Sequence, residues 1–478
     1  LSLSSNVFAQ AAPAPAKPAP APAAPPAAPA PAPVPGPPPV TPAPAPPPAD
    51  APPPPAPEPT PLPAAPAEPA PHADPEPDLP PLESYSEGGD AWYDLIDFSA
   101  FVDAYAGWNF NNPKPQYGRN TYRAHDQANG FALSWVGVNA SYPADPVGGT
   151  ISLRFGPTAT QLGSCPSGTC DSDVGLQYVK QAFVSWKPGG ADSAITLDLG
   201  KFDTPYGVEV AESQLNVNYT RSFLYTLAQP SFHTGLRANF AVAEVFDFRL
   251  LAVNGWNRSI DNNVGKTFGA QGTLHIKNAE GADALTASLG YLAGPEADDT
   301  QSVSCPDGEV FSPDAAGGCA PGMAGATTGT LDRGSANSDS WQHLVDLVVV
   351  ADPIRQLRLL LNADFGLANV YDSFEDDYLS RSYFGVLLGA RVAITEGFGI
   401  GARGEYVSDP DGFLTHYDNE KISLVSGTLT LEALPADFLT VKLDARIDWS
   451  DKEIFNKDLR DLTGKQFTTT LGVVAHTN

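Results

Sequence analysis

The chain has 478 residues and carries 55 Asp and Glu against 27 Lys and Arg, which gives a formal net charge of −28 at pH 7. This acidic balance argues against a basic surface for nucleic acid or anionic membranes. No run of apolar residues is as long as the roughly 18 that a transmembrane helix needs, so the sequence excludes an ordinary membrane-spanning helix. A transmembrane β-barrel gives a much weaker sequence signal and is not excluded.

Residues 1–9 have the features of the end of a secretory signal peptide. Val7, Phe8 and Ala9 form the small-residue pattern that precedes cleavage, here before Gln10. We therefore predict that residues 1–9 are the remnant of a signal peptide. An ordinary flexible terminus is the alternative interpretation.

Residues 10–90 form a Pro/Ala-rich segment that contains most of the 50 prolines of the chain. The segment has almost no aromatic or β-branched side chains, so it cannot bury enough apolar surface to offset the entropy of ordering. We predict a disordered, polyproline-II-rich linker on the periplasmic side. It is either an inert spacer or a segment that engages the cell wall or a protein partner.

Residues 91–478 are predicted to fold as one antiparallel β-barrel, because apolar and polar residues alternate there in segments of about ten residues. The clearest segment is 438–448, where Leu443 and its apolar neighbours face one way while Lys442, Asp444 and Arg446 face the other. A soluble sandwich would turn its polar face to bulk water. A barrel in lipid turns the apolar face outward and the charged face into the lumen.

The connections between the predicted strands alternate in length. Long ones follow the odd-numbered strands and tight ones follow the even-numbered strands, as expected for extracellular loops and periplasmic turns. A soluble sandwich has no reason to sort its loops in this way. The pattern predicts about sixteen strands, centred near residues 103, 136, 153, 182, 198, 237, 251, 272, 288, 346, 362, 389, 403, 428, 444 and 472.

The four cysteines lie in two of the predicted outer loops. The simplest pairing in an oxidising compartment is local, Cys165 with Cys170 and Cys305 with Cys319. A zinc site is the alternative, although no His lies near either pair.

Residues 203–230 form a connection that is longer than most loops in compact domains, and such loops are usually either functional or disordered. The loop follows the fifth predicted strand, on the side of the long loops. It carries the candidate constriction residues Asp203, Glu209, Glu212 and Arg221. An extracellular flap packed outside the pore is the alternative.

Charged residues from many strands share the polar face. Such charges would be prohibitive in a packed core without partners, whereas they cost little when they line water. A barrel of about sixteen strands leaves an aqueous channel, and rings of charge then select which solutes pass. The candidate pore-lining residues are Arg154, Asp198, Arg237, Lys277, Arg358, Asp364, Arg391, Arg403, Glu405, Lys442, Asp444 and Arg446.

The sequence shows no catalytic or metal-binding motif, so we predict neither an enzyme nor a cofactor. The seven His residues lack hydrolase or metalloprotease spacing. A barrel hydrolase that draws on His233 or His343 is the least unfavourable enzyme hypothesis. Glu375, Asp376 and Asp377 form a weak calcium candidate, for which a solvated loop is the simpler interpretation.

Three segments resemble the OmpL-like β-barrel porins of Gram-negative bacteria. They are Gly107–Pro113, Leu199–Glu209, and Pro230–Arg237 followed by Val253–Asn257. The resemblance covers most of residues 95–478. It implies an outer-membrane channel whose loop after the fifth strand folds inward and narrows the lumen.

The sequence therefore predicts an outer-membrane porin for passive diffusion of small hydrophilic solutes, with a modest preference for cations. The alternative is a structural anchor whose leader links the outer membrane to the cell wall or to a partner. We expect outer-membrane lipids and lipopolysaccharide around the barrel, peptidoglycan or a periplasmic or outer-membrane protein as candidate partners of the leader, and no nucleic acid. A homotrimer is compatible with the sequence.

Overall fold

The structure is a computed structural model. It describes residues 95–114, 120–124, 127–163, 170–298, 300–305, 309–312, 319–322, 326, 328–332, 340–372, 377–417, 420–458 and 461–477. The predicted signal-peptide remnant and the whole of the predicted linker lie outside these residues, so both assignments stay predictions.

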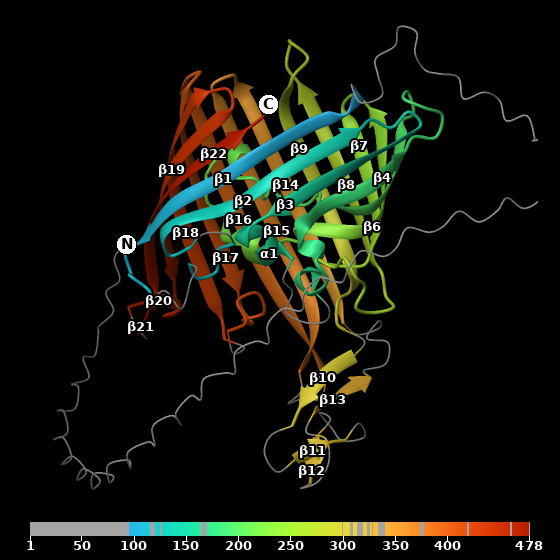
Figure 1. Ribbon diagram of the computed structural model, residues 1–478, viewed down its shortest axis with the longest axis vertical. Coiled ribbons are helices and arrows are strands. Elements are labelled where there is room, and N and C mark those ends of the chain that lie inside the picture. Colours follow the sequence, from blue (N-terminus) through green and yellow to red (C-terminus); the bar gives the residue numbers. More distant parts are fainter. Residues whose placement is uncertain are drawn as a thin grey trace, which may run out of the picture. The chain divides into compact units, whose positions relative to one another are not determined.

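Sixteen antiparallel strands form a closed barrel (Figure 1). Each strand pairs with its neighbour in the sequence, and the last strand pairs with the first between Phe101–His476 and Asn109–Thr468. The barrel strands are β1 (Asp97–Asn109), β2 (Asn129–Tyr142), β3 (Val147–Phe155), β4 (Val179–Trp186), β5 (Ile195–Asp203), β6 (Phe232–Ala243), β7 (Phe246–Val253), β8 (Thr267–Lys277), β9 (Asp283–Pro295), β14 (Trp341–Ile354), β15 (Leu357–Asp372), β16 (Asp377–Thr395), β17 (Phe398–Asp409), β18 (Ile422–Ala436), β19 (Leu439–Ser450) and β22 (Lys465–His476).

The remaining elements are short and belong to the long connections. The helical ones are α1 (Pro157–Leu162), α2 (Asp171–Val174), the 3₁₀ turns η3 (Leu176–Tyr178) and η4 (Ser213–Leu215), and the π-helical turn η5 (Leu224–Ala228). Three strand pairs complete the set: β10 (Thr300–Ser304) with β13 (Thr328–Asp332), β11 (Glu309–Phe311) with β12 (Cys319–Pro321), and β20 (Phe455–Lys457) with β21 (Asp461–Thr463). None of the helices in the described parts of the chain is long and apolar enough to cross a membrane.

The barrel strands bury their polar faces and expose their apolar faces. In β19, Lys442 and Arg446 are each 1% exposed, whereas Leu443 between them is 42% exposed. The neighbouring strand β22 repeats the arrangement with buried Thr470 and exposed Leu471. This inversion of the usual soluble pattern is what a barrel in lipid requires, because its outer wall meets hydrocarbon and its inner wall meets polar groups.

The sequence-based fold prediction is confirmed. Every predicted strand centre falls inside one barrel strand, and long and short connections alternate with one exception. The connection after the eleventh strand was predicted to be long, but β15 and β16 extend so far that only residues 373–376 separate them. The short turns include residues 278–282 between β8 and β9, 355–356 between β14 and β15, and 396–397 between β16 and β17. Several strands run further into the turns than predicted; β18, for example, continues through Ala436, which pairs with Leu439 after a register shift.

The disulfide between Cys305 and Cys319 is confirmed and lies in the long connection between β9 and β14. Cys165 lies outside the described residues, so the pairing with Cys170 stays a prediction. Glu375 and Asp376 of the calcium candidate also lie outside the described residues. Only the backbone of Asp377 is described, at the start of β16.

Candidate functional site: a loop folded across the barrel lumen

The connection between β5 and β6, residues 204–231, lies inside the ring of strands, and we call it the lumen loop. Its large side chains are buried: Phe223 and Leu224 are fully covered, and Tyr206 and Tyr219 nearly so. Irregular backbone has to satisfy its own polar groups when it is buried. The contacts of the lumen loop with the barrel wall do this.

Both ends of the lumen loop are fixed to the same pair of strands, β14 and β15. Near its start, the Gly207 amide donates to Asp346 Oδ1 at 3.2 Å. Near its end, Gln229 Nε2 donates at 2.7 Å to both Asn362 Oδ1 and Asp364 Oδ2. Because Asp346 and Asp364 are opposite each other in the β14–β15 register, one small polar patch of the wall holds both ends.

The middle of the lumen loop is fixed to other strands, β1 and β19. The amide and the hydroxyl of Thr220 both donate to Asp444 Oδ2 at 2.8 Å. The Tyr219 hydroxyl donates to Asp103 Oδ1 at 2.6 Å, and the Ser213 hydroxyl donates to Asp103 Oδ2 at 2.5 Å. The loop therefore crosses the lumen between β14–β15 and β19–β1.

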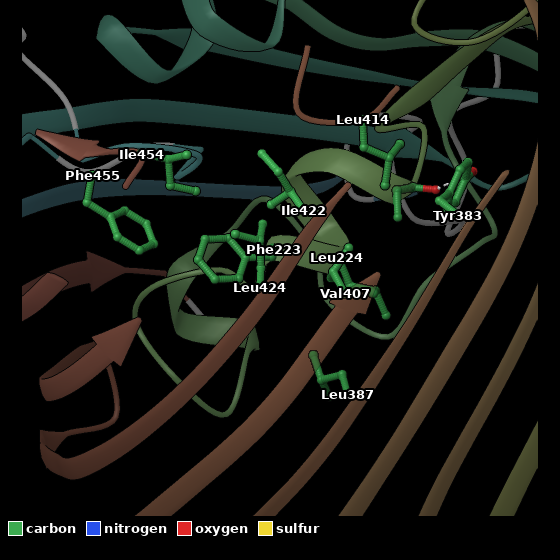
Figure 2. Close-up of a cluster of buried hydrophobic side chains, with 11 residues drawn as sticks. Phe223, Leu224, Tyr383, Leu387, Val407, Leu414, Ile422, Leu424, Ile454 and Phe455 are labelled. Carbon is green, nitrogen blue, oxygen red and sulfur yellow. Dashed lines mark hydrogen bonds between the residues drawn. The ribbon is translucent and has the colours of Figure 1, made fainter. Parts of the chain in front are cut away.

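An apolar cluster holds the π-helical turn η5 of the lumen loop. Phe223 and Leu224 lie among side chains of the wall and of the connections after β17 and β19 (Figure 2). Deeply buried apolar side chains of this size typically stabilise a packed arrangement by about 1.5–3 kcal/mol each. The partners are Tyr383, Leu387, Val407, Leu414, Ile422, Leu424, Ile454 and Phe455.

Glycines on the inner faces of the wall make room for the lumen loop. A Cβ atom at Gly472 would lie 2.0 Å from the Tyr219 ring, and one at Gly290 would lie 2.6 Å from the Tyr206 ring. Gly385 likewise faces Leu224. Each of these glycines stands where the alternation predicts an inward residue. A glycine at such a position is the sequence signal for a wall site that another segment approaches closely.

The predicted constriction residue Glu209 forms an ion pair with the wall. Its Oε1 accepts from Arg403 Nη1 at 2.5 Å, and its Oε2 accepts from the Ser222 amide at 2.8 Å. Glu209 thus joins three parts of the structure: the first half of the lumen loop, its second half, and strand β17.

Glu212 and Asp203 share Lys180, a residue that the sequence analysis did not select. Lys180 Nζ lies 2.5 Å from Asp203 Oδ2 and 2.9 Å from Glu212 Oε1. Arg154 Nη2 is 2.7 Å from the same Glu212 oxygen. Burial alone would raise the pKa of Glu212, but Lys180 and Arg154 outweigh it and lower the pKa to about 2. Glu212 is therefore ionised at any physiological pH.

Arg221 is buried against the lumen loop itself. Its guanidinium donates to backbone carbonyls of the lumen loop, including Tyr219 O at 2.6 Å and Val210 O at 3.3 Å, and also to the Ser213 hydroxyl at 3.1 Å. A guanidinium presents five donors in a fixed plane, so it can hold several turns of irregular backbone together. In the structure, Arg221 braces the loop internally.

Several predicted pore-lining charges lie beneath the lumen loop or against other side chains instead of lining water. Arg446 contacts Asp448 at 2.6 Å and Glu405 at 3.3 Å. Glu405 Oε2 in turn accepts from the Phe223 amide at 2.5 Å. Lys442 Nζ donates to the Ser213 carbonyl at 3.1 Å. The physical reason is that the loop fills the space over these charges and replaces water as their partner.

Other predicted pore-lining residues also lie against acidic side chains, and one of them, Arg358, lines a cavity beside the lumen loop. Arg237 pairs with Asp198 at 2.9 Å. The other two arginines also face carboxylates, Arg358 with Asp352 at 2.9 Å and Arg391 with Glu432 at 2.6 Å, while Lys277 ends β8 in an exposed position.

The two histidines of the hydrolase hypothesis are placed as structural residues. His233 Nε2 is 3.1 Å from the Thr204 hydroxyl, and His233 Nδ1 is 3.0 Å from the Gly255 carbonyl. His343 Nδ1 is 2.8 Å from the Tyr291 hydroxyl. These contacts do not form a Ser–His–Asp arrangement. Within the described residues, no group of three or more His, Cys, Asp or Glu side chains is placed to hold a metal ion.

Two cavities flank the lumen loop, and Glu209 lines both. The first, of about 70 Å³, lies against α1 and the ends of β3 and β5 that lead into long connections. The second, of about 110 Å³, lies on the side of the short turns and includes Val350 and Arg358. Glu209 therefore lies between the two cavities, and its partner Arg403 lines the second.

A family model described as "Putative beta-barrel porin-2, OmpL-like" matches residues 95–476. The chain belongs to this family. The match spans the whole barrel, from β1 to β22, and so confirms the resemblance noted in the sequence.

Three solved outer-membrane proteins are similar to this chain at low sequence identity, and no curated protein matches it. The outer-membrane channel DcaP of Acinetobacter baumannii is 11% identical, covers 80% of this chain and 97% of its own, and has a TM-score of 0.49. A loop L8 deletion mutant of OmpT from Vibrio cholerae is 13% identical, with coverages of 80% and 99% and a TM-score of 0.48. An anion-selective porin from Comamonas acidovorans is 10% identical, with coverages of 80% and 99% and a TM-score of 0.45.

A separate carboxylate, Glu296, holds the long connection after β7 to the one after β9. Its Oε1 accepts from the Thr267 hydroxyl at 2.6 Å, and its Oε2 accepts from the Trp256 amide at 3.0 Å. A Cβ atom at Gly255 would lie 2.6 Å from Glu296 Oε2, so only glycine allows this approach. Burial raises the pKa of Glu296 to about 7.

We predict that Gly472→Ala loosens the lumen loop without unfolding the barrel. The added methyl group would overlap the Tyr219 ring, and overpacking of this kind typically costs about 1–3 kcal/mol. Amide hydrogen exchange in residues 216–222 should become roughly tenfold faster or more, since 1.4 kcal/mol is a factor of ten. Gly404→Ala is the control, because nothing lies within 4 Å of a Cβ atom there. Equal exchange in the two variants would contradict the proposed packing.

We predict that residues 254–266, the connection after β7, are held less tightly to Glu296 as pH rises. The folded state holds the proton of Glu296 up to a pKa of about 7, against an ordinary value of 4.5. The stability contributed by the neutral carboxyl is therefore present below pH 4.5 and is lost as pH rises through about 7. Hydrogen exchange of this segment, corrected for intrinsic rates, should show less protection at pH 8 than at pH 5. Glu296→Gln should remove the difference; a difference that persists in this variant would contradict the assignment.

Proposed function

We propose that the protein is an outer-membrane porin that lets small hydrophilic solutes and ions diffuse passively, with the lumen loop as its constriction. The observation that carries the proposal is the loop itself, which crosses the lumen from β14–β15 to β19–β1 and leaves a cavity on each side. Passive diffusion needs no bound cofactor and no catalytic group. The family and the fold support a channel rather than an enzyme.

The volumes of the two cavities indicate which solutes fit beside the lumen loop. A water molecule occupies about 30 Å³ in the liquid, so the cavities of about 70 and 110 Å³ hold only a few waters each. Cavities of this size suit water and small ions. Larger hydrophilic solutes require side chains around Glu209 to move.

The accessibility of one carboxylate, Asp203, supports a modest preference for cations. The negative charge of Glu209 is balanced by Arg403, and that of Glu212 by Arg154 and Lys180. The Asp203 side chain is 35% exposed, compared with 7% for Glu212, so it is the most accessible of the three carboxylates. Charged side chains at a constriction set which ions pass.

A plugged barrel that anchors the envelope is the second candidate function. The observation that favours it is the density of contacts between the lumen loop and the wall, which include buried ion pairs such as Glu209 with Arg403. In that case the Pro/Ala-rich leader would bind peptidoglycan or a periplasmic or outer-membrane partner. For either function we propose outer-membrane lipids and lipopolysaccharide as surroundings, and a homotrimer as a candidate assembly.

The full-length protein in a planar lipid bilayer tests the channel function. We predict stepwise increases in conductance. Folded protein that inserts but gives no current would favour the structural-anchor function. In a KCl gradient, the combined variant Asp203→Asn, Glu209→Gln, Glu212→Gln should move the zero-current potential toward that of an anion-selective pore. The cation-to-anion permeability ratio should fall by about twofold or more, because charged side chains at a constriction select ions and the variant removes three of them from the proposed constriction.

A matched variant controls for the loss of three charges. Asp145→Asn, Glu244→Gln and Glu280→Gln remove the same number of carboxylates from short turns between strands. This variant should keep the wild-type zero-current potential. An unchanged potential in the constriction variant would remove the lumen loop from the conduction path.

A further inference from the structure

The cavity between the lumen loop and β3–β5, which we call the aromatic chamber, has the composition of a binding site for a small organic cation. Four aromatic rings line it, from Trp135, Tyr206, Tyr225 and Phe232. Its volume is about 70 Å³, which is roughly that of two waters. The space suits an ammonium group with one or two attached carbons.

The basic residues of the chamber already have acidic partners. Arg154 and Lys180 contact Glu212 at 2.7 and 2.9 Å. Lys201 forms an ion pair with Asp171. An anionic ligand would have to displace one of these carboxylates from a buried position, and an uncompensated buried charge is strongly destabilising. The pairing therefore disfavours anions.

The carboxylate of Asp203 can accept further hydrogen bonds from a ligand in the chamber. Its Oδ2 accepts from Lys180 Nζ at 2.5 Å, and no described residue donates a hydrogen bond to its Oδ1. The side chain is 35% exposed. Each carboxylate oxygen has two acceptor sites, so Asp203 can accept from an ammonium group while it keeps its contact with Lys180.

The rings of the chamber already bind positive charge. Lys201 Nζ lies 4.0 Å from the centroid of Phe232, and the Arg154 guanidinium carbon lies 5.4 Å from that of Trp135. A cation over an aromatic face is attracted by the electron-rich ring, and cages of such rings recognise alkylammonium groups. Tyr206, held by the hydrogen bond from its hydroxyl to the Tyr291 carbonyl at 3.0 Å, presents a fixed ring to the same space.

We propose that the aromatic chamber binds small alkylammonium cations, with Asp203 accepting hydrogen bonds from the ammonium group and the ring of Tyr206 packing against it. This deepens the proposed function, because it names the class of solute that the constriction retains. The chamber lies on the side of the long connections and Glu209 lines it, so a cation entering from that side reaches the chamber before it reaches the second cavity.

Saturation-transfer NMR on the full-length protein in detergent micelles tests the proposal without requiring conduction. The probes are ethylammonium, ethanol and acetate, at matched ionic strength. Ethylammonium and ethanol have the same number of heavy atoms and differ in charge. We expect saturable binding of ethylammonium and none of ethanol or acetate; binding of acetate instead, or of none of the three, would overturn the proposal.

Variants separate the carboxylate from the ring. Asp203→Asn should weaken ethylammonium binding by about tenfold, equivalent to 1.4 kcal/mol. Tyr206→Leu should weaken binding severalfold, whereas Tyr206→Phe keeps the ring and should bind as the wild type does. Asp247→Asn is the control, because Asp247 pairs with His275 in another part of the barrel. Wild-type affinity in both Asp203→Asn and Tyr206→Leu would overturn the proposal.

Comparison with the bilayer recordings keeps the two proposals distinguishable. If the protein conducts but does not bind ethylammonium, the channel proposal stands and the alkylammonium site is ruled out. If the protein binds ethylammonium but does not conduct, the binding site stands and the channel function is ruled out.

Discussion

The constraint on which the structure depends is that charged groups inside the barrel need partners once water is displaced. A sixteen-stranded barrel is wide enough to hold water around its inner charges. Here the lumen loop takes much of that space, and burial of an unpaired charge is strongly unfavourable. The result is a set of matched contacts between loop and wall, such as Glu209 with Arg403 and Glu212 with Arg154. The charges of the lumen loop therefore match those of the inner wall, and each set needs the other as its partner.

This constraint connects packing to function. The wall uses glycine where the rings of the lumen loop approach, as at Gly472 and Gly290, so the loop can lie close to the strands without strain. Asp103 and Asp444 then hold the middle of the loop by hydrogen bonds. A loop fixed in this way has a defined position and a defined set of charges. Both are needed if the protein is to select solutes by size and charge.

The sequence predicts the barrel well because each strand carries its own alternating pattern. In β19 the alternation is enough to assign Lys442 and Arg446 to the inner face. The contacts of the lumen loop could not be predicted in the same way, because they join residues far apart in the chain; Glu209 and Arg403 are separated by 194 positions. Arg221 was assigned to the constriction from its charge, yet it braces the loop backbone. No local pattern distinguishes a charge that faces water from one that faces a carbonyl.

A designed cross-link between the lumen loop and the wall tests the central claim most directly. Val217 lies in the loop, and a Cβ atom at Gly401 of β17 would lie 2.8 Å from its side chain. The account predicts that Val217→Cys with Gly401→Cys forms a disulfide in the folded barrel, and that single-channel conductance is the same before and after reduction. Failure to form the disulfide, or a conductance that rises on reduction above that of the wild type, would contradict a loop that is docked across the lumen in the working state.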